Sequence, residues 1–105
     1  MAYDKIGRKV VARLLVDGRK FVTTAGTAVA MASSSTHVDW VIITAETNNT
    51  GVMAVGASTV VASLTTRRGT SLSAGESVVL ASVDLADVYI DATVSTDGVT
   101  YLYRA

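Results

Sequence analysis

The sequence predicts an all-β domain, either a sandwich or a barrel, and three observations support this prediction. Val, Ala, Thr and Ser dominate the composition, and such small, often β-branched side chains suit a pleated packing surface better than a helical core. Roughly seven to nine short apolar runs are separated by turn signals about every 8–12 residues. The chain has no proline, and no segment requires a helix longer than one turn.

The length predicts one domain. A chain of 105 residues can bury a core of its own without disulfides or metals. We expect residues 1–8 to form an N-terminal arm and residues 9–105 to form the β domain. The absence of cysteine excludes a disulfide framework, a thiolate metal site and a cysteine nucleophile.

The most strongly β-favouring run, Val38–Ala45, contains the only tryptophan, Trp40. Turn-forming residues follow at Thr47–Gly51, and a second apolar run follows at Val52–Ala57. We interpret this stretch as a central hairpin whose first strand is apolar on both faces, with Trp40 at the centre of the core.

The first strand is expected at Lys9–Val16, although its apolar spacing also fits a helix. Asp17-Gly18 is a strong hairpin signal, so Lys20–Thr24 is expected to return beside it. The β-branched content and the Asp-Gly pair favour the strand.

The rest of the chain predicts further strands joined by turns. In order, the remaining expected strands are Thr27–Ala32, Thr59–Leu64, Thr70–Leu72 at a sheet edge, Ser77–Ala81, Val88–Val94 and Val99–Tyr103. Asp84–Asp87 is expected to be a corner of one 3₁₀ turn, with Asp84 capping backbone N–H groups. Asp97-Gly98 predicts a hairpin that places the last two strands side by side.

Catalytic and metal chemistry find little support in the sequence. His37 and Asp39 would share a strand face, but no nucleophile elbow accompanies them, so we interpret His37 as a surface histidine and expect no enzyme. Asp84, Asp87 and Asp91 form the densest carboxylate group, yet their spacing matches no calcium loop, and Asp91 is expected on a solvated face. We therefore predict neither a metal site nor a cofactor.

Other side chains are candidates for interaction. Tyr89, Tyr101 and Tyr103 fall on the last two strands and could stack on a sugar, pack at the core edge or meet another subunit. Arg67 and Arg68 lie on a predicted loop, where they could contact phosphate or simply be solvated.

Charge is unevenly distributed. The formal net charge is zero, but residues 1–20 carry six basic and two acidic side chains, and the other 85 residues carry three basic and seven acidic. This separation predicts head-to-tail or inter-subunit pairing, and a solvated basic arm is the alternative. The candidate contacts in the arm and the adjacent strand are Lys5, Arg8, Lys9 and Arg13. Zero net charge argues against broad nucleic-acid binding.

No membrane partner is expected. Met1–Arg8 carries charge without an apolar segment after it, so no signal peptide is predicted. No run approaches the ~20 apolar residues of a membrane span.

Three predicted strands are apolar on both faces, namely Val10–Val16, Val38–Ala45 and Ser77–Ala81. A small domain can cover only a few strands on both sides. We therefore expect the remaining apolar surface to meet other subunits, which predicts a homo-oligomer or docking on a larger assembly.

Five stretches follow one another in a recognisable order and spacing. They are V-x-W-V-x-I with N-x-G at Val38–Ile43 and Asn49–Gly51, V-G-x-S at Val55–Ser58, L-x-A-G-E-S-V-x-L at Leu72–Leu80, D-L-x-x-V-Y-I-D at Asp84–Asp91 and D-G-V-x-Y-L-Y at Asp97–Tyr103. From about Thr36 to Tyr103, about two thirds of its length, the chain resembles small virion structural proteins of tailed bacteriophages.

The resemblance implies a β-sandwich, jelly-roll-like module of a virus particle, assembled in the cytoplasm of a bacterial host. Such a chain would be a non-enzymatic capsid decoration or head-accessory protein, or else a tail or head–tail joining component. Its partners would be further copies and the capsid or tail proteins. A carbohydrate- or receptor-binding module using Tyr89, Tyr101, Tyr103 and Arg67 is the alternative, and an enzyme using His37 and Asp39 is a third.

Overall fold

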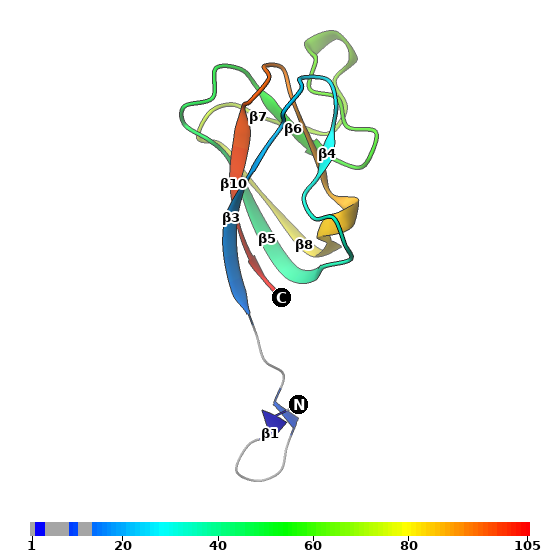
Figure 1. The fold of residues 1–105 in the computed structure, drawn as a ribbon, viewed down its shortest axis with the longest axis vertical. Coiled ribbons are helices and arrows are strands. Elements are labelled where there is room, and N and C mark those ends of the chain that lie inside the picture. Colours follow the sequence, from blue (N-terminus) through cyan, green and yellow to red (C-terminus); the bar gives the residue numbers. More distant parts are fainter. Residues whose placement is uncertain (1, 4–8, 11–13) are drawn as a thin grey trace.

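Two antiparallel four-stranded sheets pack face to face in the computed structural model, which describes residues 2–3, 9–10 and 14–105 (Figure 1). The long sheet contains, in spatial order, β3 (Leu15–Phe21), β10 (Gly98–Arg104), β5 (His37–Ala45) and β8 (Ser77–Asp84). The short sheet contains β4 (Val29–Ala30), β9 (Tyr89–Ala92), β6 (Met53–Gly56) and β7 (Thr70–Leu72). Two 3₁₀ turns, η1 (Leu64–Thr66) and η2 (Leu85–Asp87), and a pair of two-residue strands, β1 (Ala2–Tyr3) and β2 (Lys9–Val10), complete the described elements. The predicted all-β sandwich is confirmed.

The strand order is that of a jelly roll. From β3 to β10, every strand lies in the opposite sheet from its predecessor, except that β6 and β7 are hydrogen-bonded neighbours. Two four-stranded sheets wound in this way form the eight-stranded double Greek key. The predicted central hairpin is therefore wrong, because β5 and β6 lie in different sheets.

The core lies between the inner faces of the two sheets. On β5 the side chains of Val41, Ile43 and Ala45 are buried, and they face Met53 and Ile90 of the short sheet across one continuous cluster. The period of two in β5 follows from the pleat, which sends alternate side chains to opposite faces.

The predicted hairpin at Asp17-Gly18 is wrong. β3 continues through both residues because it pairs along its whole length with β10, where Gly18 lies opposite Tyr101. Gly18 lacks the positive φ that a two-residue hairpin turn needs. It instead leaves room for the Tyr101 ring, since a Cβ at Gly18 would lie 2.6 Å from Cζ of Tyr101.

The second Asp-Gly pair does not form the expected hairpin either. The turn falls at Ser95–Thr96, where Thr96 has a φ of 75°, and Gly98 already belongs to β10. β9 and β10 lie in different sheets, so the strands carrying Tyr89 and Tyr101 are not side by side.

Two side chains lie on faces opposite to those expected. Trp40 is half-buried outside the core cluster, whereas Asp91 is only 1% exposed. Asp91 is buried because the segment around Val60–Ala62 folds over the outer face of the short sheet and forms a small second cluster there with Ala54. The Asp91 carboxylate accepts hydrogen bonds from the backbone N–H groups of Gly26 and Ala62, at 3.0 and 2.9 Å.

Replacing Gly18 tests its close approach to Tyr101. Gly18→Ala should lower the free energy of unfolding by about 1–3 kcal/mol, because the added methyl group overlaps the ring. In a Tyr101→Ala background the same substitution should cost less than about 0.5 kcal/mol or stabilise the strand, because alanine is otherwise favoured over glycine. Urea denaturation of the four proteins measures this cycle. An equal cost in both backgrounds would contradict the assigned contact.

Candidate interaction surface

The outer face of the long sheet carries an apolar surface built from all four strands. Directly opposed residues of an antiparallel pair share a face, so the register assigns its side chains. One row across the sheet contains Asp17, Leu102, Ile42 and Val79. The next row contains Leu15, Arg104, Trp40 and Ala81.

This face is open to solvent among the residues that the structure describes. Leu15 is 65% exposed and Val79 is 62% exposed, while Trp40, Ile42 and Leu102 are half-buried. An antiparallel sheet with one wet face normally carries polar side chains there. The outer face of the short sheet is not open to solvent in this way, because the chain's own segment around Val60 packs on it.

The prediction that two strands are apolar on both faces is confirmed. On β5, Val41 and Ile43 point into the core while Trp40 and Ile42 point out. On β8, Val79 lies on the outer face, and its neighbours are half-buried against the core. The other predicted strand of this kind, Val10–Val16, lies partly outside the described residues.

A charged rim borders the apolar rows on β3 and β10. The guanidinium of Arg19 forms an ion pair of 2.7 Å with the carboxylate of Glu46 and lies 4.8 Å from the ring centroid of Phe21. Asp17 and Arg104 are exposed on the same face.

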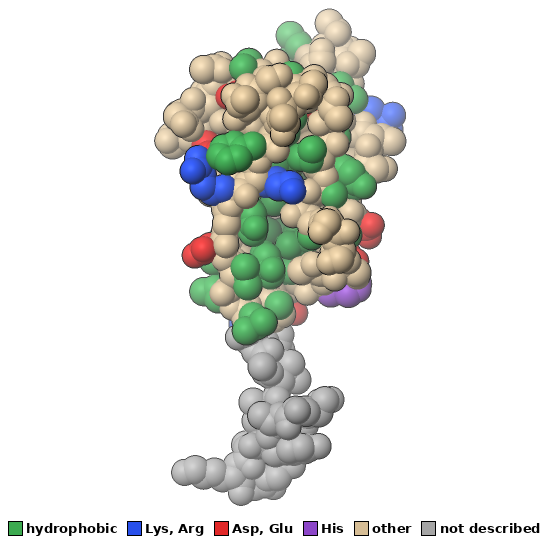
Figure 2. All heavy atoms as spheres, in the orientation of Figure 1, with side chains coloured by type: hydrophobic (Ala, Val, Ile, Leu, Met, Phe, Trp, Pro, Cys, Tyr) green, Lys and Arg blue, Asp and Glu red, His purple; other side chains and the backbone are tan. Residues whose placement is uncertain are grey.

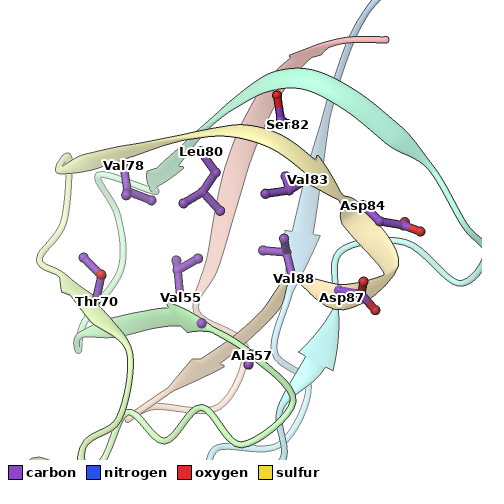
Figure 3. A pocket seen from close by; sticks show the side chains of 11 residues that line it. Val55, Ala57, Thr70, Val78, Leu80, Ser82, Val83, Asp84, Asp87 and Val88 are labelled. Atoms are coloured by element: carbon purple, nitrogen blue, oxygen red, sulfur yellow. The ribbon is translucent and has the colours of Figure 1, made fainter.

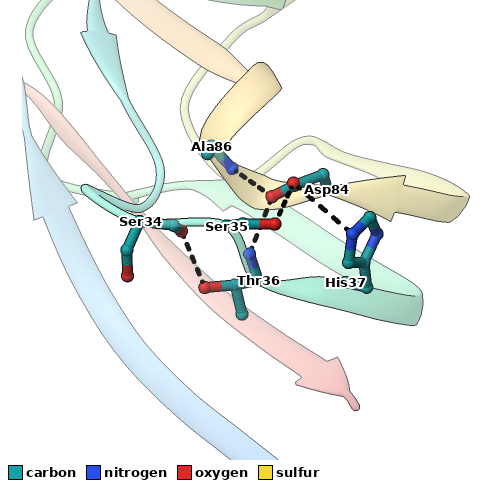
Figure 4. A network of polar contacts seen from close by, with 6 residues as sticks. All are labelled: Ser34, Ser35, Thr36, His37, Asp84 and Ala86. Carbon is teal, nitrogen blue, oxygen red and sulfur yellow. Dashed lines mark hydrogen bonds and ion pairs between the residues drawn. The ribbon is translucent and has the colours of Figure 1, made fainter.

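Hydrogen bonds to the Asp84 carboxylate stabilise the corner at the C-terminal end of β8 (Figure 4). Its carboxylate accepts hydrogen bonds from the Ser35 hydroxyl at 2.6 Å, the Thr36 N–H at 2.8 Å and the Ala86 N–H at 2.9 Å. The last bond caps η2, so the predicted 3₁₀ corner and its capping residue are confirmed.

Those hydrogen bonds stabilise the ionised carboxylate. The Ser35 hydroxyl first, and then the Thr36 and Ala86 N–H groups, lower the pKa of Asp84 from 3.8 to about 2. His37 is exposed, and its Nε2 lies 3.8 Å from Asp84 Oδ2. Because Ser35 donates its proton to the carboxylate and not to the imidazole, this group lacks the serine–histidine contact of a nucleophilic triad.

A cleft of about 490 Å³ opens between β8 and the short sheet (Figure 3). Val55 and Val88 line one wall, and Val78, Leu80 and Val83 line the other. The charged residues at its end are Asp84 and Asp87, and the Asp84 carboxylate is turned toward Ser35 and Thr36. Most of the side chains that line the cleft are apolar.

The predicted tyrosine group is divided between the sheets. The rings of Tyr101 and Tyr103 stack at 6.1 Å on the inner side of the long sheet, where both are half-buried, whereas Tyr89 is in the short sheet. Hydrophobic side chains gather beside β3, where the long sheet extends past the short one (Figure 2). The three tyrosines therefore form no single platform for a sugar.

Of the predicted basic contacts, the structure describes the side chains of Arg67 and Arg68. Arg67 is half-buried and donates from Nε to the backbone oxygen of Ala62, while Arg68 is exposed. Lys5, Arg8 and Arg13, like most of the expected arm at residues 1–8, lie outside the described residues, and of Lys9 only the backbone, in β2, is described.

Sequence reasoning did not name Trp40, Ile42, Val79 and Leu102 as contact residues. The signal was present, because an apolar side chain at every position of Val41–Ile43 cannot be buried by one neighbouring sheet. The sequence did not show which of these strands would join one sheet, or that the outer face of that sheet would stay uncovered.

Comparison with models of known protein families, with curated proteins and with solved structures finds no match to this chain. Within residues 2–3, 9–10 and 14–105, no three His, Asp or Glu side chains are grouped so that they could hold a metal ion. The same part of the chain contains no helix of the length and apolarity needed to span a membrane.

The Asp84 network makes stability depend on pH. The folded-state pKa lies below the unfolded one, so its contribution is complete above about pH 4 and is lost as the pH falls through about 2. Asp84→Asn should therefore be less stable than the wild type at neutral pH and should lose less stability on acidification. The amide has no negative charge and does not titrate, and a nitrogen in place of Oδ2 cannot accept the bond from the Ser35 hydroxyl. Urea denaturation from pH 7 to 2 measures the difference, with Asp87→Asn, at an exposed position of η2, as the control. Parallel profiles for Asp84→Asn and wild type would contradict the assignment.

Proposed function

We propose that this chain is a non-enzymatic assembly protein that makes repeated contacts with further copies and with neighbouring proteins. The observation that carries the proposal is the apolar outer face of the long sheet. Monomeric proteins seldom leave a contiguous apolar patch of several strands in water, and such patches mark interaction sites. Interface centres are enriched in Trp and other large apolar side chains, which Trp40 and Ile42 supply.

The proposed setting is the virion of a tailed bacteriophage, most simply as a capsid decoration or head-accessory protein. The resemblance of Thr36–Tyr103 to small phage virion proteins supports this setting. Eight-stranded jelly rolls are frequent in viral capsid proteins and also occur in lectins and cupins, so the fold contributes support by analogy. A tail or head–tail joining component satisfies the same observations.

Charge separation suggests how the arm takes part. Residues 1–20 carry a net charge of +4 and the remaining 85 carry −4. A basic arm is attracted to an acidic surface at long range, which speeds encounter and fixes orientation. In the proposal the arm docks on an acidic neighbour while the outer face of the long sheet makes the apolar contact.

A charge placed on the outer face should weaken assembly. Val79→Lys should reduce self-association by roughly tenfold or more, because an interface centre excludes an unpaired ammonium group. Leu64→Lys is the matched control, since Leu64 is 77% exposed and lies on η1, which follows the short-sheet strand β6. Sedimentation equilibrium across protein concentrations gives both values. Equal association of the two variants would show that the outer face is not the contact.

Removal of the arm tests the virion setting. Deletion of residues 2–9 should leave the circular dichroism spectrum and the thermal transition unchanged, because the core cluster lies between Val22 and Val99. Incorporation of the truncated chain into particles of the phage that encodes it should be lost. Normal incorporation would refute the role of the arm, and absence of the full-length chain from purified particles would refute the virion setting.

A further inference from the structure

One acidic and one basic side chain occupy neighbouring positions on the outer face of the long sheet. Asp17 lies opposite Leu102, and Arg104 lies opposite Leu15, so the two charged residues are diagonal neighbours on β3 and β10. Both are exposed, and neither has an ion-pair partner among the described residues. Asp17 lies at the β3 end of one row, and Arg104 lies between Leu15 and Trp40 in the other.

The positions of Asp17 and Arg104 make the charge on this face self-complementary. In an isologous contact, each copy presents the same surface to the other, so a residue pair formed once is formed twice. A face with charges of one sign would repel its own copy and would suit a partner of opposite charge. A face that presents an acid and a base beside apolar side chains, with its further cation Arg19 already paired to Glu46, fits a second copy of itself.

The sheet geometry allows both charged contacts to form together. A twofold axis in the plane of the sheet can place Asp17 of one copy over Arg104 of the other. With strands ~4.8 Å apart and same-face residues ~6.7 Å apart along a strand, that axis runs close to Leu15, Leu102 and Ile42. Each of these three apolar side chains then meets its own counterpart, and the strands cross at roughly 110°, near the orthogonal class of sheet packing.

We propose that two copies of this chain pack the outer faces of their long sheets together about a twofold axis, with Asp17 of each copy paired to Arg104 of the other. The inference rests on the proposed assembly function and identifies the partner of its apolar face. Leu15, Leu102 and Ile42 form the centre of the contact.

The size of the face sets the strength of the contact. Four strands and about seven residues along each give a footprint of roughly 400 Å² per copy, about half of the ~800 Å² per partner of a standard stable interface. The isolated dimer is therefore weak and dependent on concentration. Within a particle, other contacts such as the arm raise the effective concentration and make the same face persistently occupied.

A charge exchange between the two sites tests the pairing. D17R gives each copy two cations and R104D gives each copy two anions, so either variant alone should self-associate at least tenfold more weakly than the wild type. An equimolar mixture should regain wild-type association as a heterodimer, because both cross-copy contacts become complementary. The double variant D17R/R104D should also self-associate like the wild type, which shows that neither substitution damages the fold.

Two charge reversals at other exposed positions serve as the control for the change in net charge. D87R and R68D produce the same charge changes at exposed positions away from this face and should self-associate like the wild type, alone or mixed. The readout is sedimentation velocity at about 150 mM salt, with long-range attraction largely screened.

Three results would overturn the inference. D17R and R104D could associate as well as the wild type, their mixture could fail to regain association, or the wild type could remain monomeric at millimolar concentration. Each of these leaves the proposed assembly function to be judged separately by incorporation of the chain into particles.

Discussion

The winding of the chain between two sheets is the constraint on which the rest of this structure depends. From β3 to β10, only β6 and β7 follow one another within a sheet, so the other connections cross the edge of the core. Backbone N–H groups in the segments between strands need acceptors, because unpaired buried donors are costly. Three carboxylates supply them, and each joins segments that are distant in sequence. Asp84 joins Thr36 to Ala86, Asp91 joins Gly26 to Ala62, and Asp97 accepts from Thr50 and Gly51.

The two sheets differ in size, and this difference exposes the proposed contact face. The short-sheet strands contain two to four residues, and the segment around Val60 covers their outer side. The long-sheet strands contain seven to nine residues and present Ile42 and Val79 to solvent. In an assembly protein the uncovered side is where interaction free energy is available, since burial of apolar area drives association.

Several carboxylates of the described residues accept hydrogen bonds from backbone N–H groups. Asp91 and Asp97 are buried with backbone N–H partners, and Asp84 is turned to its corner. The apolar cleft beside β8 contains no directed nucleophile or base among the described residues.

The sequence by itself determined the local features. The nearly unbroken apolar runs Val38–Ala45 and Ser77–Ala81 predicted strands apolar on both faces, because the pleat sends consecutive side chains to opposite faces. Asp84–Asp87 predicted a capped 3₁₀ corner, which depends on nearest-neighbour hydrogen bonds. Only the tertiary structure decided which sheet each strand joins. Pairing with β10 over its whole length carried β3 through Asp17-Gly18, overriding a strong local turn signal. Long-range packing also placed Trp40 outside and Asp91 inside. The face that becomes buried depends on which distant segments pack against it, and local sequence does not contain that information.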